Sequence, residues 1–418
     1  MRAMKDSGVE WIGEIPEKWG VVRTKCLFSH YKKIVGESSG EYQRLALTLK
    51  GVIQRSKDDS VGLQPGEFNN YQVLNAGNLV FKLIDLENVS TSRVGLSPFT
   101  GIVSPAYIIL TPTADECIKF FYYHFYSMWQ CEIFNHMGDD GVRSALNARD
   151  LLNIPIPFPP PAEQQRIAAY LDEQCGEIDK VLAKTRESIE EYKKLKQSVI
   201  TEAVTKGIRP DRPMKPSGIE WIGDIPTEWE VCRIKNVIFP QQRPVCDDDE
   251  IITCFRDGEV TLRKNRREDG FTISFTEHGY QGVEVGDLVI HGMDAFAGAI
   301  GCSDSRGKTS PVVHVCKTVG NNRFFMYFLR SMAFGDILMD LSNGVRIRSS
   351  DFRNFSKLGV FGAIIPDIAE QNEIVDYLDV RCAEVDHLIT KKEQIITELE
   401  GYKKSLIYEC VTGKLEVE

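Results

Sequence analysis

The densest cluster of side chains with binding chemistry is the basic run RKNRR, residues 263–267, which follows the turn DGEV. The first half holds a sparser version, in which Lys50, Arg55 and Lys57 fall within LKGVIQRSK. An arginine guanidinium is a planar fork that donates two parallel hydrogen bonds, which suits phosphates and the guanine edge. These runs therefore predict contacts with a nucleic acid, with an ordinary solvated loop as the alternative.

Single cations elsewhere extend this set, and the sequence does not separate contacts with phosphates from contacts with bases. The predicted DNA-contacting residues are Lys50, Arg55, Lys57, Arg93, Arg143, Arg256, Arg263, Lys264, Arg266, Arg267, Arg306, Lys308, Arg346 and Arg348.

The residue types that serve in catalysis form no recognisable catalytic motif in this sequence. The segment GCSDSRGKT at Gly301 places five residues between its glycines, where a phosphate-binding P-loop needs four. The Glu-x-Lys triplet at Glu191 has no companion carboxylate, and FPPP at Phe158 is not the tetrad of amino-methyltransferases. The eleven cysteines and seven histidines form no pair at metal-ligand spacing. The sequence thus predicts no catalytic, cofactor-binding or metal-ligating residue on this chain.

The distribution of charge decides whether nucleic-acid binding is plausible. The formal net charge of −10 opposes it, because DNA binding requires neutralisation of phosphates. However, segments 162–205 and 369–412 together carry a net charge of −7, so the other 330 residues carry a net charge of only −3. The remaining parts can therefore present basic faces. No apolar stretch reaches membrane-spanning length and no signal segment begins the chain, so a cytoplasmic protein is expected.

Two gapless internal repeats form the frame that must position the cations. The opening SGVEWIGEIPEKW at Ser7 recurs as SGIEWIGDIPTEW at Ser217, within a window where 14 of 22 positions agree. The segment AEQQRIAAYLDEQCGEID at Ala162 recurs as AEQNEIVDYLDVRCAEVD at Ala369, in a match of 44 positions with 19 identities. Agreement of this extent indicates an internal duplication.

Both copies of the second repeat have the spacing of long helices, over residues 162–205 and 369–412. Their apolar residues recur at intervals of seven and of three or four, which predicts that the helices pack on each other. Two separate surface helices, each packed on its own domain, are the alternative. The predicted helix–helix contacts are Ile178, Leu182, Ile189, Tyr192, Val199, Val385, Ile389, Ile396, Leu399 and Leu406.

Further residues bear on how tightly the two helices pack. Lys196 and Lys403 interrupt the apolar seam, so packing there must loosen or let each ammonium group reach water. Five apolar residues are expected to broaden the buried seam: Val181, Leu195, Leu388, Ile395 and Tyr402.

The segments between the repeats hold 136 residues in the first half and 133 in the second, with the same predicted element order. Strands are predicted at GNLVFKLI from Gly77 and at GDLVIHGM from Gly286, and helices over 117–134 and 323–341. Each predicted helix precedes a GVR segment, and its aromatic residues fit a core better than a base-stacking surface. We therefore expect two mixed α/β compartments of one fold, which bind different parts of one extended partner such as duplex DNA.

This frame resembles the specificity subunit of Type I restriction–modification systems over essentially the whole chain. The doubled openings, the GNLV and GDLV turns, the GVR segments and the AEQ..I..YLD helix starts carry the resemblance. It implies two target-recognition domains separated by an antiparallel pair of long helices, with approximate two-fold symmetry. The expected boundaries are residues 1–160 and 209–365 for the domains, and 161–208 and 366–418 for the helices.

The resemblance also implies a function. Each domain would read one half of a split, asymmetric DNA site, and the helices would set the gap and dock two modification subunits. Such subunits are catalytically inert alone. The modification subunits carry S-adenosylmethionine and methylate adenine N6, and restriction subunits use ATP and magnesium for cleavage. A stand-alone DNA-binding scaffold and a self-sufficient methyltransferase remain the rival hypotheses.

Overall fold

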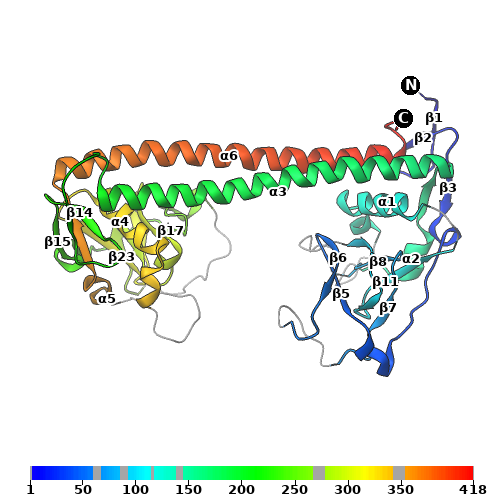
Figure 1. Ribbon diagram of the computed structural model, residues 1–418, viewed down its shortest axis with the longest axis horizontal. Coiled ribbons are helices and arrows are strands. Elements are labelled where there is room, and N and C mark those ends of the chain that lie inside the picture. Colours follow the sequence, from blue (N-terminus) through cyan, green and yellow to red (C-terminus); the bar gives the residue numbers. More distant parts are fainter. Residues whose placement is uncertain are drawn as a thin grey trace. The chain divides into compact units, whose positions relative to one another are not determined.

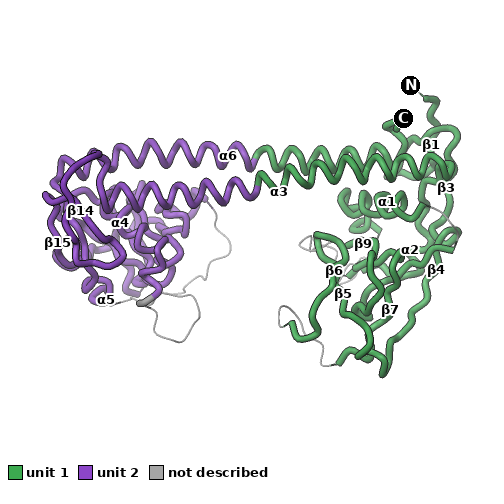
Figure 2. The backbone as a smooth tube through the Cα atoms, in the orientation of Figure 1, with its two compact units in different colours: residues 1–185, 394–418 green, residues 186–393 purple. Residues whose placement is uncertain are grey.

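The chain folds into two compact units that each contain part of both long helices. The computed structural model describes residues 2–59, 67–84, 93–113, 117–137, 145–266, 278–341 and 354–417. Unit 1 comprises Met1–Thr185 and Gln394–Glu418, and unit 2 comprises Arg186–Glu393. The long helices α3 (Pro161–Lys206) and α6 (Ile368–Thr412) each continue from one unit into the other (Figures 1 and 2).

Unit 1 is built on two four-stranded sheets, with strand orders β6-β5-β10-β7 and β4-β11-β8-β9. All described strand pairs in these sheets are antiparallel except β10 with β5, which pair in parallel at Ile102 and Arg44. Two small antiparallel pairs, β1-β2 and β12-β3, complete the unit. The elements are β1 (Met4–Asp6), β2 (Glu14–Pro16), β3 (Gly20–Arg23), β4 (Phe28–Ser29), β5 (Arg44–Thr48), β6 (Gly51–Arg55), β7 (Gln72–Leu74), β8 (Leu79–Phe81), β9 (Val94–Leu96), β10 (Gly101–Val103), β11 (Ile108–Pro112), α1 (Ile118–Gln130), α2 (Ala148–Asn153) and β12 (Pro155–Phe158).

Unit 2 repeats part of this plan in smaller sheets. Strands β16, β23, β20 and β21 form a four-stranded sheet in that order, and β17-β18 and β19-β22 form two separate antiparallel pairs. The pairs β13-β14 and β15-β24 correspond to β1-β2 and β3-β12 of unit 1. The elements are β13 (Met214–Pro216), β14 (Asp224–Pro226), β15 (Glu230–Arg233), β16 (Ile238–Pro240), β17 (Ile252–Cys254), β18 (Val260–Leu262), β19 (Gln281–Val283), β20 (Leu288–His291), β21 (Ile300–Cys302), β22 (Gly307–Thr309), β23 (Val313–Thr318), α4 (Asn322–Phe334), α5 (Ser356–Gly359) and β24 (Gly362–Ile365).

Helices α1 and α4 form the aromatic centre of each core, as their sequences predict. In α1, the rings of Phe120 and Phe121 meet edge to face at 5.2 Å, and both side chains are fully buried. Each helix is shorter than expected, because a residue in the left-handed conformation follows it: Glu132 at φ 59° and Asp336 at φ 60°. Such a residue ends an α-helix, so the last predicted turns are separate 3-10 segments, Ile133–His136 and Ile337–Leu341.

Each copy of the duplicated opening forms a hydrogen bond to the first turn of a long helix. The indole Nε1 of Trp19 donates a hydrogen bond to Glu163 Oε2 at 2.8 Å, near the start of α3. Trp229 makes the equivalent bond to Glu370 Oε2, also at 2.8 Å, near the start of α6. All four residues belong to the repeated motifs, so the repetition preserves one structural joint in both units.

An arginine completes this joint in each unit. The guanidinium of Arg2 lies 5.3 Å from the centre of the Trp19 ring and donates to the carbonyl of Gly413, just after α6. In unit 2, Arg212 lies 5.2 Å from the Trp229 ring and donates to the carbonyl of Lys206, the last residue of α3. Each joint therefore ties the beginning of one long helix to the end of the other.

The two long helices pack on each other, as the seam predicts. In unit 1, Ile178 and Leu182 of α3 share a core with Leu406 of α6. In unit 2, Ile200 of α3 shares a core with Leu378 of α6. Of the ten residues predicted to make helix–helix contacts, Ile178, Leu182, Ile189 and Leu406 are buried, and Tyr192, Val199, Val385, Ile389, Ile396 and Leu399 are half-buried.

The expectation that further apolar residues broaden the seam is wrong. The five side chains are 40–56 % exposed: Val181, Leu195, Leu388, Ile395 and Tyr402. A pair of helices buries only a narrow stripe on each partner, and these residues lie beside that stripe. They leave an apolar surface on the outside of each unit.

The two lysines that interrupt the seam form matched ion pairs between the helices. In unit 2, the ammonium of Lys196 lies 2.6 Å from Asp386 Oδ2, and in unit 1 that of Lys403 lies 2.7 Å from Asp179 Oδ1. The lysines occupy equivalent positions of the repeat, and so do the aspartates. The ammonium groups are thus satisfied by the partner helix, and one antiparallel register is fixed in each unit.

None of the helices in the described residues combines the length and the apolar character needed to cross a membrane.

Candidate nucleic-acid interface

Three of the predicted arginines come together in unit 2, in a cleft of about 670 Å³ that we call the arginine cleft. Its walls come from β17, the turn between β17 and β18, the segment after β18, and the ends of β20 and β22. Its lining residues are Ile251, Ile252, Thr253, Cys254, Phe255, Arg256, Asp257, Arg263, Arg266, Tyr280, His291, Asp294, Thr309, Ser310 and Val313.

The turn between β17 and β18 packs closely against the Arg330 side chain of helix α4. Gly258 in this turn has φ 93°, and a Cβ there would lie 2.0 Å from Arg330 Nη1. Only glycine fits this position, because a side chain would meet both an unfavourable conformation and a buried guanidinium. The turn therefore places Arg256 and Asp257 at the cleft on a rigid base.

Arg266 is fully engaged within the protein. Its guanidinium lies 2.5 Å from Asp257 Oδ2 and 3.0 Å from Glu259 Oε2, and 4.3 Å from the centre of the Phe255 ring. Burial is the largest single effect and raises the pKa of Asp257, but the hydrogen bonds from Arg266 and from the backbone N–H of Glu259, together with the nearby arginine charges, lower the net pKa. This arginine therefore builds the wall of the cleft.

Arg256 is held at the cleft with most of its surface free. Its side chain is 68 % exposed, and its Nη2 donates to Asp294 Oδ1 at 2.9 Å. The backbone N–H of Asp294 donates in turn to His291 Nδ1 at 3.1 Å. Burial lowers the pKa of His291, which keeps the ring neutral at pH 7 so that Nδ1 remains an acceptor.

The other predicted cations of unit 2 also have partners inside the unit. Arg263 Nε donates to Thr253 Oγ1 at 3.2 Å, and Lys264 lies 2.5 Å from Glu250 Oε2. Lys308 is half-buried on β22, where its backbone N–H donates to the carbonyl of Glu250. Arg263 and Lys264 therefore each lie beside a hydroxyl or a carboxylate of the same unit.

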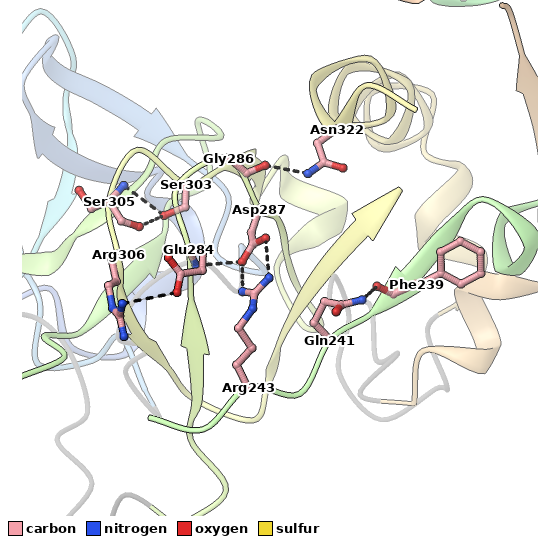
Figure 3. A network of polar contacts seen from close by, with 10 residues as sticks. All are labelled: Phe239, Gln241, Arg243, Glu284, Gly286, Asp287, Ser303, Ser305, Arg306 and Asn322. Carbon is pink, nitrogen blue, oxygen red and sulfur yellow. Dashed lines mark hydrogen bonds and ion pairs between the residues drawn. The ribbon is translucent and has the colours of Figure 1, made fainter. Parts of the chain in front are cut away.

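Arg306 belongs to a polar network outside the cleft (Figure 3). Its guanidinium lies 3.7 Å from Glu284 Oε1, a contact drawn in Figure 3. It also lies 3.3 Å from Asp249 Oδ1. The backbone N–H of Glu284 donates to Asp287 Oδ2, and Asp287 also receives two hydrogen bonds from Arg243. Asp287 is 2 % exposed and belongs to the GDLV turn, so the network stabilises this turn. Arg306, whose side chain is 55 % exposed, is the cation of this network that faces solvent.

In unit 1, the predicted cations follow the β5–β6 hairpin. Lys50 is exposed at its turn and lines a smaller cleft of about 590 Å³ together with Lys119. Arg55 Nε lies 2.8 Å from Asp59 Oδ2, and Lys57 donates to the carbonyl of Ser39 at 2.6 Å. The remaining lining residues of this cleft are Gly51, Val52, Gly77, Leu96, Ser97, Pro98, Cys117, Ile118 and Tyr122.

One predicted DNA contact is wrong. Arg93 is 1 % exposed, and its Nη1 donates to the carbonyl of Ile84 at 2.8 Å. The buried guanidinium satisfies a backbone acceptor just after β8, so it is part of the core and cannot reach a ligand at the surface. Four predicted contacts, with both GVR segments, lie outside the described residues: Arg143, Arg267, Arg346 and Arg348.

Sequence reasoning missed Tyr280, His291 and Asp294 as cleft residues. They lie in segments distant from Arg256, and folding alone brings them together. The one available signal was that Asp294 follows directly after the predicted strand segment GDLVIHGM. Within the described parts of the chain, no group of three or more histidine, cysteine, aspartate or glutamate residues is arranged to hold a metal ion.

Comparison with known proteins agrees with this arrangement. Residues 49–191 match the family described as the Type I restriction modification DNA specificity domain. The chain is 24 % identical to the Type I restriction enzyme MjaVIII specificity subunit of Methanocaldococcus jannaschii, over 96 % of this chain and 94 % of that protein. It is 23 % identical to the Type I restriction enzyme EcoBI specificity subunit of Escherichia coli, over 72 % and 66 % of the two chains.

A solved structure described as the structural basis of complex assembly and conformational transition of the type I R-M system has the same fold. Its TM-score is 0.69 at 14 % identity, and the match covers 96 % of this chain and 99 % of that one. Fold and site thus define a protein of two related α/β units that share a helical frame and carry different clefts. Residues 49–191 thus match the DNA specificity domain of Type I restriction–modification systems, and over nearly its whole length the chain is similar to Type I restriction enzyme specificity subunits.

Proposed function

We propose that this chain is the DNA sequence-reading subunit of a Type I restriction–modification complex, and that each unit reads one part of a bipartite, asymmetric site. The observation that carries the proposal is that one duplicated frame bears two different clefts. Unit 2 presents three arginines in its cleft, whereas unit 1 presents two lysines beside apolar residues. Two readers with different side chains favour two different half-sites.

The long helices supply the proposed docking surface for two modification subunits. Val181 and Leu388 are equivalent in the repeat and are 47 % and 40 % exposed. Leu195 and Tyr402 are likewise equivalent and are 49 % and 56 % exposed. Each unit therefore exposes apolar side chains from both helices, and such surfaces favour a protein partner. The equivalence of the two sets favours two copies of one partner.

In this proposal the chemistry belongs to the partners. The modification subunits would carry S-adenosylmethionine and methylate adenine N6, and restriction subunits with ATP and magnesium would add cleavage. This chain would act without catalysis of its own, by selecting the DNA sequence and setting the gap between its two parts.

Co-expression with a modification subunit of a Type I restriction–modification system tests the proposal. We expect the two proteins to co-purify, and N6-methyladenine mapping of the host DNA to give one split motif. Deleting the gene for this chain should abolish methylation at that motif while the modification subunit is still produced. Methylation that persists without this chain would contradict the proposed role.

The rival function is a DNA-binding scaffold that acts without a methyltransferase. Its supporting observation is that the arginine cleft lies wholly within unit 2 and needs no partner residue for its walls. Sequence-specific binding by the isolated chain, together with failure to co-purify with the modification subunit, would favour this alternative.

A further inference from the structure

The inference concerns how Arg256 is used. A cation can contribute to DNA binding in two ways that make opposite demands on its surroundings. A phosphate contact depends on net positive charge, because the favourable free energy comes largely from release of counterions. A base contact depends on orientation, because the donors must match two acceptors on one base edge. A carboxylate beside the arginine cancels the charge but fixes the direction of the guanidinium plane.

Arg256 has the second kind of surroundings. Its Nη2 donates to Asp294 Oδ1 at 2.9 Å, and 68 % of its side chain stays exposed at the arginine cleft. A guanidinium carries five N–H donors, so one hydrogen bond to a carboxylate leaves a donor edge for a ligand. Arg266, by contrast, has two carboxylates and an aromatic ring against it.

The backbone on both sides of this pair is fixed. The carbonyl of Asp294 accepts hydrogen bonds from the N–H groups of Ala297 and Ala299, at 2.9 and 3.3 Å. Gly298 has φ 94°, and a Cβ there would lie 2.6 Å from the carbonyl oxygen of Arg256. The loop that carries Asp294 is therefore packed directly on the backbone of Arg256, and His291 holds it from the other side.

We infer that Arg256, oriented by Asp294, is a specificity-determining residue that reads a guanine in the half-site of unit 2. The inference rests on the proposed function. Guanine is the base whose O6 and N7 atoms accept the two parallel hydrogen bonds that an arginine fork donates. In this assignment Asp294 is a positioning residue, and the arginine cleft admits the base edge beside it.

Three substitutions in the complete complex with the modification subunit test the inference: Arg256→Ala, Arg256→Lys and Asp294→Asn. The Lys and Asn variants change hydrogen bonding with little loss of side-chain volume. They therefore keep the test valid if Arg256→Ala does not fold. Equilibrium binding is measured on the methylated motif and on duplexes with each base pair of the motif replaced in turn, at two salt concentrations. Arg209→Ala is the matched control, because Arg209 is an exposed arginine of unit 2 paired with Glu373, outside the cleft.

Both Arg256 variants and Asp294→Asn should lose discrimination at the same G·C pair, by roughly 5- to 150-fold. Binding to unrelated DNA should be unchanged, and the slope of log K against log salt should change by less than one. Arg209→Ala should behave as the wild type. The inference is overturned if Arg256→Lys retains full discrimination, because the discrimination then does not depend on the oriented guanidinium fork. It is also overturned if Asp294→Asn tightens binding to all sequences alike, because that result identifies a phosphate contact.

The same data separate this inference from the function on which it rests. A wild-type complex without any sequence preference refutes the proposed function itself. A wild-type complex whose sequence preference survives all three substitutions refutes only the assignment of Arg256.

Discussion

At the scale of single residues, the repeat shows where one unit departs from the other. His124 on α1 is buried, and neither ring nitrogen has a hydrogen-bond partner among the described residues. Its ring lies 5.4 Å from that of Trp11. In unit 2, Phe328 on α4 lies 5.6 Å from Trp221, in the equivalent place. The histidine therefore occupies a position built for a phenylalanine ring.

This position predicts an acid sensitivity in unit 1. Burial lowers the pKa of His124 from 6.5 to about 3. Below pH 6.5 this histidine is therefore protonated in the unfolded chain but stays neutral in the folded chain. Protonation stabilises the unfolded state, so the free energy of unfolding falls as the pH drops from 6.5 towards 3. At pH 5 the loss is about 2 kcal/mol. We expect His124→Phe to remove it, measured by urea unfolding at pH 5 and pH 7.5.

Phe328→His provides the reciprocal control, because it should introduce the same acid sensitivity into unit 2. If the wild type and His124→Phe lose stability in parallel between pH 7.5 and pH 5, the assignment of this effect to His124 is wrong.

At the scale of elements, the joint between the repeated opening and each long helix should be a main stabilising feature. Glu370 is 3 % exposed, accepts a hydrogen bond from Trp229, and lies 2.6 Å from Arg212 Nη2. Removing the charge of a buried ion pair leaves the partner uncompensated, at a cost of about 3 kcal/mol. We expect Glu370→Gln to lower the free energy of unfolding by that amount, followed through Trp fluorescence in urea.

The matched control is Glu373→Gln, three residues further along the same helix. Glu373 pairs with Arg209 at 2.7 Å, but both side chains are about half exposed. Such a pair contributes far less to stability than a buried one, because solvent screens it. Equal losses in the two variants would contradict the role given to the buried joint.

The repeat over 162–205 and 369–412 predicted the long helices to within one residue, because their apolar spacing extends over six turns and prolines mark their starts. The wider boundaries that the resemblance implied, 161–208 and 366–418, extend up to six residues beyond the helices. It did not predict which apolar residues stay exposed, because the width of the buried stripe depends on the partner helix. Nor did it identify Asp179 and Asp386 as partners of the seam lysines, because those pairs form between segments far apart in the chain. The same holds for the arginine cleft. The sequence revealed the basic run at 263–267 but not the carboxylates that pair with its residues.

At the scale of the whole molecule, the duplication separates what the two units share from what differs between them. The shared residues form the joints and the helix pairing, as in Trp19 and Trp229 or Lys403 and Lys196. The residues that line the clefts are unlike, and they lie in the segments where the repeat fades. In the proposed function, the shared frame would keep the docking surface for the partners constant while the unlike clefts give each unit its own sequence preference.

The continuity of α3 and α6 through both units predicts that helix length sets the gap in the recognised sequence. A heptad inserted into α3 between Asp179 and Lys196, with another into α6 between Asp386 and Lys403, leaves the ion pairs of both units in register. Seven residues lengthen a helix by about 10 Å and turn it by nearly two full turns, so the packed faces stay aligned. That length corresponds to roughly 3 base pairs of DNA.

We therefore expect the doubly extended protein to direct methylation to the same two half-sites with a gap about 3 base pairs longer. N6-methyladenine mapping in cells that express the modification subunit measures the gap directly. A heptad inserted into α3 alone should abolish methylation, because the two helices then differ in length and cannot keep both ion pairs. Methylation at the original gap by the doubly extended protein would show that the helices do not set the gap.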